Sequence, residues 1–306
     1  MRKVFFLVLA AMAAFTAQAQ NIQLHYDFGR NIYSDEESDR QKVTVTVEQF
    51  KADDWGSWYY FFDLDLTSKV TRSIYTEISR ELKLGKESPL AAHVEYDGGL
   101  WHADVPNGCG SYQQAGLLGV AYNGHNADFS KTWSVQALYK QFIKSYDGTH
   151  SYPSFQLTGV WGLNFLDSKM TFSGFIDLWR GEKGANYGEK QGHGMLVLLT
   201  EPQLWYNVNK HLSVGTEIEI SNNFIVNYYN DKTFFVNPTV ALKWNLEVTE
   251  SKYRKTPTLR HKHRFVGFFL TYLSLRFVDG RRIVRIAVDD AACQELAPRA
   301  SCRIAP

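Results

Sequence analysis

The run WGSWYYFFDLDL, residues 55–66, decides the fold class. Large apolar side chains recur in it at every second position, at Trp58, Tyr60, Phe62 and Leu64. A repeat of two is that of a β-strand, in which successive side chains point to opposite faces. The other face mixes aromatic and acidic groups, and its members are Tyr59, Phe61, Asp63 and Asp65.

The same alternation recurs along the chain and predicts about twelve strands. They lie near residues 22–28, 43–48, 57–66, 71–82, 90–97, 115–123, 132–143, 155–165, 170–178, 196–206, 212–220 and 236–246. Most of the stronger ones reach ten residues, which is the length of a tilted membrane strand and longer than most globular strands. Pro202 and Pro238 fall inside two of them and predict bulges or strand ends there, because proline cannot donate to the ladder.

The N-terminus has the pattern of a secretory signal. Arg2 and Lys3 precede an apolar run, residues 4–15, which is too short to span a membrane as a helix. Ala17-Gln18-Ala19 supplies small residues for cleavage. We therefore expect residues 1–19 to be removed.

Connection lengths give an independent indication of a membrane barrel, in which outside loops are long and periplasmic turns short. The first (30–41), fifth (98–114), ninth (180–193) and eleventh (222–232) connections are long, whereas the second, eighth and tenth are short. The third (67–70) and the sixth (123–131) break the rule. The sequence predicts an all-β fold, a transmembrane antiparallel up-and-down β-barrel of about twelve strands over residues 20–246, in the bacterial outer membrane.

Charge separates residues 247–306 from the barrel. The chain has a net charge of +1, but residues 20–246 hold 19 Lys and Arg against 26 Asp and Glu, and residues 247–306 hold 12 against 6. Arginine also outnumbers lysine after residue 246, by 9 to 3. The last alternating strand ends at Leu246, where an aromatic residue normally closes such a barrel. We expect residues 247–306 to be an atypical basic extension outside the barrel; the alternative is a periplasmic segment that binds another protein.

Three runs resemble the nucleoside-specific (Tsx-like) channel superfamily of the outer membrane, and within it a set of Bacteroidetes outer-membrane proteins. They are WGSWYYFFD (55–63), LLTEPQLWY (198–206) and NPTVALKWN (237–245). The similarity covers roughly residues 20–246. It implies a narrow twelve-stranded channel that passes nucleosides. No lumenal motif of this sequence matches the substrate contacts of that superfamily.

Side chains on the polar faces of the strands are the candidates for a solute path. Carboxylates are costly against lipid, so they should face the lumen and form a ring that favours cations or neutral solutes. Aromatic faces there could stack on a flat solute, or simply pack and narrow the lumen. The candidates are Tyr59, Phe61, Asp63, Asp65, Tyr75, Glu201, Gln203, Trp205, Glu217, Glu219 and Lys243.

Other chemistries have little support. His93, His125 and His193 lack a convincing serine partner for a hydrolase, and Cys109, Cys293 and Cys302 have no zinc-like spacing. No nucleotide-binding loop or HExxH helix is present. We expect no enzyme activity, cofactor, metal or nucleic-acid partner.

The leading hypothesis is a passive channel for a small polar solute, with nucleosides as the candidate that the resemblance implies. Its other partners would be outer-membrane lipid and the barrel-assembly machinery. The alternatives are a non-conducting barrel whose long loops bind a partner, and a lipid-modifying barrel enzyme.

Overall fold

A computed structural model describes residues 20–103, 108–144, 150–182, 194–225 and 230–246. The expected signal peptide, the extension after residue 246 and much of the ninth connection lie outside these ranges. Among the described residues, no helix is long and apolar enough to cross a membrane.

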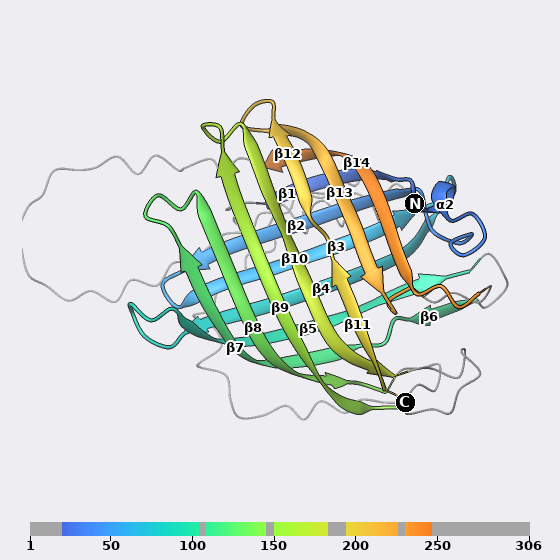
Figure 1. The fold of residues 1–306 in the computed structure, drawn as a ribbon, viewed down its shortest axis with the longest axis horizontal. Helices are drawn as coiled ribbons and strands as arrows, with labels where there is room; N and C mark the ends of the chain where they lie inside the picture. Colours follow the sequence, from blue (N-terminus) through green and yellow to red (C-terminus); the bar gives the residue numbers. More distant parts are fainter. Residues whose placement is uncertain (1–19, 104–107, 145–149, 183–193, 226–229, 247–306) are drawn as a thin grey trace, which may run out of the picture. The chain divides into compact units, whose positions relative to one another are not determined.

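The described chain is one antiparallel sheet closed on itself (Figure 1). Its elements are β1 (Gln20–Asp27), α2 (Gly29–Ile32), β2 (Val43–Asp53), β3 (Gly56–Leu66), β4 (Thr71–Lys83), β5 (Leu90–His102), β6 (Cys109–Ser111), β7 (Ala115–His125), β8 (Lys131–Phe142), β9 (Tyr152–Phe165), β10 (Met170–Glu182), β11 (Gly194–Thr200), β12 (Gln203–Asn207), β13 (Leu212–Asn222) and β14 (Phe234–Leu246).

The barrel wall has twelve strand positions, here called staves, as the alternation predicts. Both β6 and β7 pair with β5, and both β11 and β12 pair with β10 and β13, so each couple is one interrupted stave. Each remaining strand pairs with its neighbours in sequence, and β1 pairs with β14 from Gln20↔Leu246 to Asp27↔Thr239. This last pairing closes the barrel.

The two prolines behave differently. Pro202 lies in the gap between β11 and β12, as expected, and Gly174 (φ +151°) packs against this gap, where a β-carbon would lie 2.5 Å from the Glu201 carbonyl oxygen. The expectation of a bulge or strand end at Pro238 is wrong, because β14 continues through it. Pro238 lies just beyond Asp27↔Thr239, the last pair between β1 and β14, so its missing N–H breaks no bond of that ladder, and its carbonyl oxygen still accepts the Phe28 N–H at 3.0 Å.

Connection lengths largely follow the predicted alternation. Two residues join β2 to β3, and four each join β9 to β10 and β12 to β13, whereas 28–42 and 223–233 are long. The third connection is short, as noted from the sequence, and the sixth is reduced to residues 126–130. In outer-membrane barrels the end with long connections faces outside.

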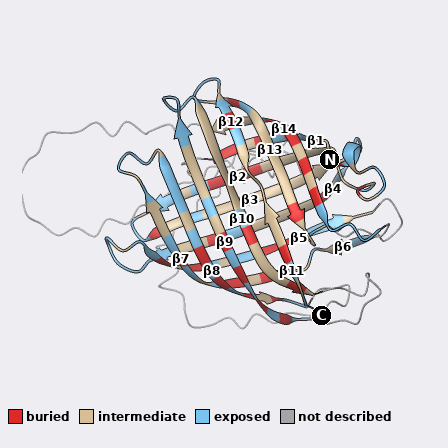
Figure 2. Cartoon of the chain, viewed as in Figure 1, coloured by how far each residue is buried: buried red, intermediate tan, exposed pale blue. Residues whose placement is uncertain are grey.

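Burial alternates most clearly along β8, β9 and β14 (Figure 2). Exposed apolar side chains lie on the outward positions, among them Leu118, Val120, Val135, Tyr139, Phe155, Leu157, Val240 and Leu242. Many inward positions are polar; a small apolar cluster of Ala115, Leu117, Leu138, Phe142 and Tyr152 and several aromatic side chains also face inward. An apolar exterior around a polar interior is the arrangement that a lipid bilayer requires of a barrel.

Candidate functional site: the lumen

The lumen is strongly acidic. Alternation and register place eleven carboxylates on inward positions of the described strands: Asp27, Glu48, Asp63, Asp65, Glu77, Glu81, Glu95, Asp97, Asp177, Glu217 and Glu219. Glu201 lies in the gap between β11 and β12. Lys140 and Lys243 occupy inward positions on β8 and β14. The carboxylates therefore far outnumber these ammonium groups.

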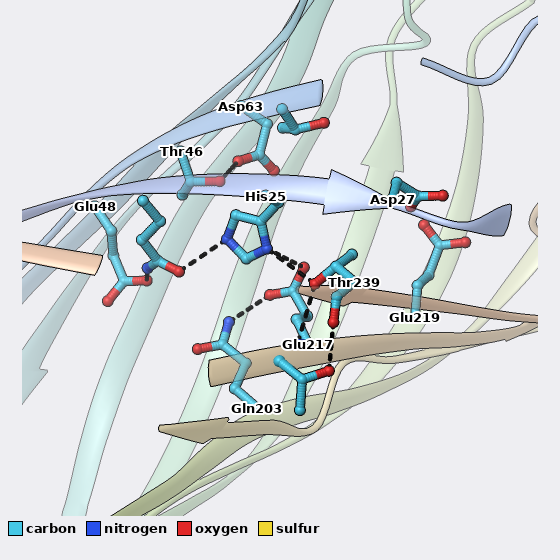
Figure 3. A network of polar contacts seen from close by, with 12 residues as sticks. His25, Asp27, Thr46, Glu48, Asp63, Gln203, Glu217, Glu219 and Thr239 are labelled. Carbon is cyan, nitrogen blue, oxygen red and sulfur yellow. Dashed lines mark hydrogen bonds and ion pairs between the residues drawn. The ribbon is translucent and has the colours of Figure 1, made fainter. Parts of the chain in front are cut away.

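One polar network is centred on His25 of β1 (Figure 3). The imidazole is 3% exposed; its Nδ1 lies 3.2 Å from Thr239 Oγ1 and 3.7 Å from Glu217 Oε1. On the far side of the ring, Nε2 lies 3.0 Å from Gln23 Oε1. Gln203 Nε2 donates to Glu217 Oε2 at 2.5 Å, so β1, β12, β13 and β14 are joined across the lumen wall.

The acidic pair of β3 is held by hydroxyl groups of the neighbouring strands. Thr46 donates to Asp63 at 2.5 Å, while Thr44 and Ser73 donate to the two oxygens of Asp65 at 2.7 and 2.6 Å. These bonds fix both carboxylates against the wall and require that they face inward.

A second network lies on the wall formed by β4, β5, β8, β9 and β10. His93, 1% exposed, lies between Glu81 (3.4 Å) and Glu95 (3.0 Å). Lys140 Nζ donates to Asp97 Oδ2 at 2.9 Å and to Gln156 Oε1 at 2.7 Å. Because these groups are buried, each charge needs its partner: an unpaired charge away from bulk water raises the free energy of the folded state.

Carboxylate oxygens of Glu77, Glu95 and Asp97 lie within 4.8 Å of one another, the spacing of a group that could hold a cation. Exposed acidic groups often gather in this way without binding an ion. Without a bound cation, ionised carboxylates at these three positions add to the negative charge of the lumen.

Aromatic side chains form two inward groups. Tyr59, Phe61 and Tyr75 are neighbours, with ring centroids 6.1 and 6.0 Å apart. Trp205 is 1% exposed: Lys243 Nζ lies 4.0 Å from its ring centroid, and its Nε1 donates to Gln203 at 2.9 Å. The Trp205 ring is therefore packed into the wall, whereas the tyrosine–phenylalanine group is partly exposed.

A polar cavity of about 560 Å³ opens at the end with short turns. Asn21, Asn207, Asn245, Ser213 and Lys243 line it from the strands, and residues 167–169 and 208–210 from the turns. Trp205 also lines this cavity and lies between the cavity and His25. The ring centroids of Trp205 and His25 are 6.1 Å apart.

Ten of the eleven predicted site residues lie on inward strand positions, and Glu201 lies in the gap between β11 and β12. The structure brings Gln203, Trp205, Glu217 and Lys243 together with His25, and sets Tyr59, Phe61 and Tyr75 on the wall between β3 and β4.

Sequence reasoning missed His25, Lys140 and Arg40, and considered His93 only for catalysis. His25 stood on the polar face of the first predicted strand, and that parity was the available signal. Of the histidines considered for catalysis, His93 is held between two glutamates, His125 stacks on Phe129 in a turn, and His193 lies outside the described residues.

A closed even-numbered barrel with an apolar exterior, a polar interior and short turns at one end is an outer-membrane β-barrel, and the protein lies in the bacterial outer membrane. Residues 19–246 match the family described as Domain of unknown function (DUF5020), and the chain belongs to that family. The match ends where β14 ends.

Among solved structures, the NanC porin aligns with 11% identity over 74% of this chain and 100% of its own, at a TM-score of 0.47. The KdgM porin aligns with 8% identity over 75% and 100%, at 0.40. LpxR from Salmonella typhimurium aligns with 8% identity over 74% and 99%, at 0.43. These scores assign no function. A comparison with curated protein sequences finds no match.

Proposed function

We propose that the barrel is a passive channel for small polar solutes, with a lumen that favours cationic and neutral solutes over anions. The observation that carries this proposal is the excess of inward carboxylates over the cations Lys140, Lys243 and Arg40, the last of which pairs with Asp27 and Glu219. Rings of acidic side chains lower the free energy of cations in a narrow pore and raise that of anions. No step of catalysis is part of the proposal.

Nucleosides are the neutral solutes that the lumen suits best. A base could stack on the partly exposed group of Tyr59, Phe61 and Tyr75, and ribose hydroxyls could donate to nearby carboxylates such as Glu77, which Tyr75 Oη approaches at 3.0 Å.

The test is the current through single proteins in a planar bilayer with a KCl gradient. We expect stepwise currents and a reversal potential on the cation-selective side. A variant carrying Asp63→Asn, Asp65→Asn, Glu201→Gln and Glu217→Gln should lose most of that selectivity. The printed bonds of Asp63, Asp65 and Glu217 go to strand residues and not to the connection at 28–42, so the variant removes none of the contacts that attach that connection.

The matched control removes the same charge outside the lumen, with Asp54→Asn, Glu87→Gln, Asp128→Asn and Asp231→Asn in exposed connections. If both variants shift the reversal potential equally, the lumenal carboxylates do not set the selectivity. If no current is seen, the barrel is not a channel.

For nucleosides, added uridine or adenosine should reduce the current at millimolar concentration. Phe61→Ala should weaken this block by about tenfold, the equivalent of about 1.4 kcal/mol of stacking. A block that Phe61→Ala leaves unchanged would contradict stacking at this group.

One observation favours a second function. Trp205 is packed between Lys243 and Gln203. The connection at 28–42 also covers part of the long-loop end. Both features are expected of a barrel that is closed to solutes and binds partners through its loops. The absence of current from correctly folded protein would favour this function over the channel.

A further inference from the structure

The connection after β1 lies against side chains that face the lumen. Tyr33 packs edge-on against Phe235, with centroids 5.2 Å apart, and its hydroxyl accepts the Val236 N–H at 3.3 Å. Lys232 Nζ lies 3.9 Å from the Tyr33 ring centroid. Phe235 is fully buried on an inward position of β14, so residues 28–42 fold over this end of the lumen.

Arg40 ties this segment to two strands. Its Nη2 lies 2.9 Å from Asp27 Oδ2 of β1 and 3.1 Å from Glu219 Oε2 of β13, while Nη1 donates to Glu219 Oε1 at 3.1 Å. Charge-assisted bonds in this forked geometry are among the strongest that side chains make. The guanidinium also lies 3.7 Å from Glu37 of its own segment.

A buried contact beside Arg40 completes the attachment. Asn237 of β14 donates to Glu37 Oε1 at 2.8 Å and to Glu219 Oε1 at 3.1 Å. Gly29 N donates to Asp27 Oδ1 at 2.6 Å. Gly29 lies so close to β14 that a β-carbon on it would be 2.5 Å from Asn237 Oδ1.

We propose that residues 28–42 are a latch that narrows the outer mouth of the lumen, and that Arg40 both holds the latch and sets the charge that an entering solute meets. The part concerning solute entry rests on the proposed channel function; the attachment of the latch does not.

The physical reason is the charge balance at the mouth. Asp27, Glu37 and Glu219 are at most 14% exposed, and Arg40 is the cation that contacts all three. Without it the three carboxylates repel one another, because they cannot be screened by bulk water. The segment then leaves the strands, the mouth widens, and its charge becomes more negative.

The first test compares Arg40→Gln with Arg30→Gln, which removes an exposed arginine from the same segment. Hydrogen exchange of the amides of residues 29–40 should be faster in Arg40→Gln than in Arg30→Gln and the wild type. Arg40→Lys should restore part of the protection. Equal exchange in both glutamine variants would overturn the latch. This measurement does not require a current.

The second test locks the latch. A β-carbon added to Gly29 would lie 2.7 Å from Asn237 Cγ, which is one bond from the Asn237 β-carbon, so the two β-carbons are no more than about 4.2 Å apart, within disulfide reach. Gly29→Cys with Asn237→Cys, in a chain with Cys109, Cys293 and Cys302 replaced by serine, should form a disulfide. Its reduction by dithiothreitol should raise the single-channel current reversibly.

Arg40→Gln should also raise the conductance and shift the reversal potential towards stronger cation preference. If the wild type conducts but neither reduction of the lock nor Arg40→Gln changes the current, the segment does not narrow the mouth. If nothing conducts, the channel fails, while the exchange experiment still decides whether Arg40 holds the segment.

Discussion

At the scale of single residues, Glu37 connects the latch to pH. Burial raises the pKa of its carboxyl group, and this outweighs the opposing effects of Arg40 and of the hydrogen bond from Asn237. A carboxyl group whose pKa is higher in the folded than in the unfolded state binds more protons when folded. Its contribution is therefore present at low pH and is lost as the pH rises through the folded value.

Glu37→Gln should consequently raise the temperature at which the folded band disappears in heat-modifiability gels at pH 8, and change it little at pH 4. Glu36→Gln is the control with the opposite sign, because a hydrogen bond from Asn230 lowers the pKa of the exposed Glu36. A stabilisation by Glu37→Gln that is equal at both pH values would contradict this account.

Two glycines of β7 provide a second prediction at this scale. A β-carbon on Gly119 would overlap the Ala137 carbonyl oxygen and lie 2.8 Å from Leu138 Cα, whereas one on Gly116 would meet nothing within 4 Å. Backbone atoms cannot move aside cheaply, so Gly119→Ala should lower the melting temperature of the barrel. Gly116→Ala should leave it close to the wild type, and equal effects would show that the close approach is not what limits position 119.

At the scale of elements, cysteine labelling can test which side chains of β3 face the lumen. Asp63 pairs with Thr46 across an inward position, and Phe62 lies one residue away on the outward face. A slip by one residue would exchange the two faces. In a cysteine-free chain, Asp63→Cys should react with a small water-soluble maleimide in proteoliposomes, and Phe62→Cys should not. The reverse pattern would mean that the strand is turned over.

The strands and their facing could be predicted from sequence, because a period of two is a local property. Residues 57–65 alone indicate which side of β3 is apolar. The path through Pro238 could not be predicted, because it depends on where β1 ends: Pro238 lies just beyond the last pair, Asp27↔Thr239, so its missing N–H breaks no ladder bond.

The contacts of the candidate site were predictable only in part. Parity places Glu217 and Glu219 in the lumen, but Arg40 meets Glu219 across 179 residues of sequence, and only closure of the barrel brings them together. Similarly, the packing of Trp205 under Lys243 depends on the neighbouring stave, so its parity alone could not distinguish a stacking face from a buried one.

At the scale of the whole molecule, the barrel is complete within residues 20–246. β14 pairs with β1 along all eight residues from Gln20 to Asp27, and the family match ends at the same residue as β14. We propose that residues 247–306 are not needed for the barrel. A chain that ends at Leu246 should reach the outer membrane and show the heat-modifiable band of the full chain; failure to do so, while the full chain assembles, would mean that the extension takes part in assembly.

The seam between β1 and β14 also governs when the protein can fold. β1 leaves the ribosome before β14, which is its partner in the closed barrel. The backbone N–H and C=O groups on that edge of β1 therefore lack their partners throughout synthesis and export. A row of unpaired backbone groups is a template for pairing with other chains. Contacts of such large sequence separation also form slowly. Premature termination anywhere before residue 234 would therefore release not a shorter barrel but an open, adhesive sheet. The chain therefore has to be kept from pairing with other chains until β14 has been synthesised and can pair with β1.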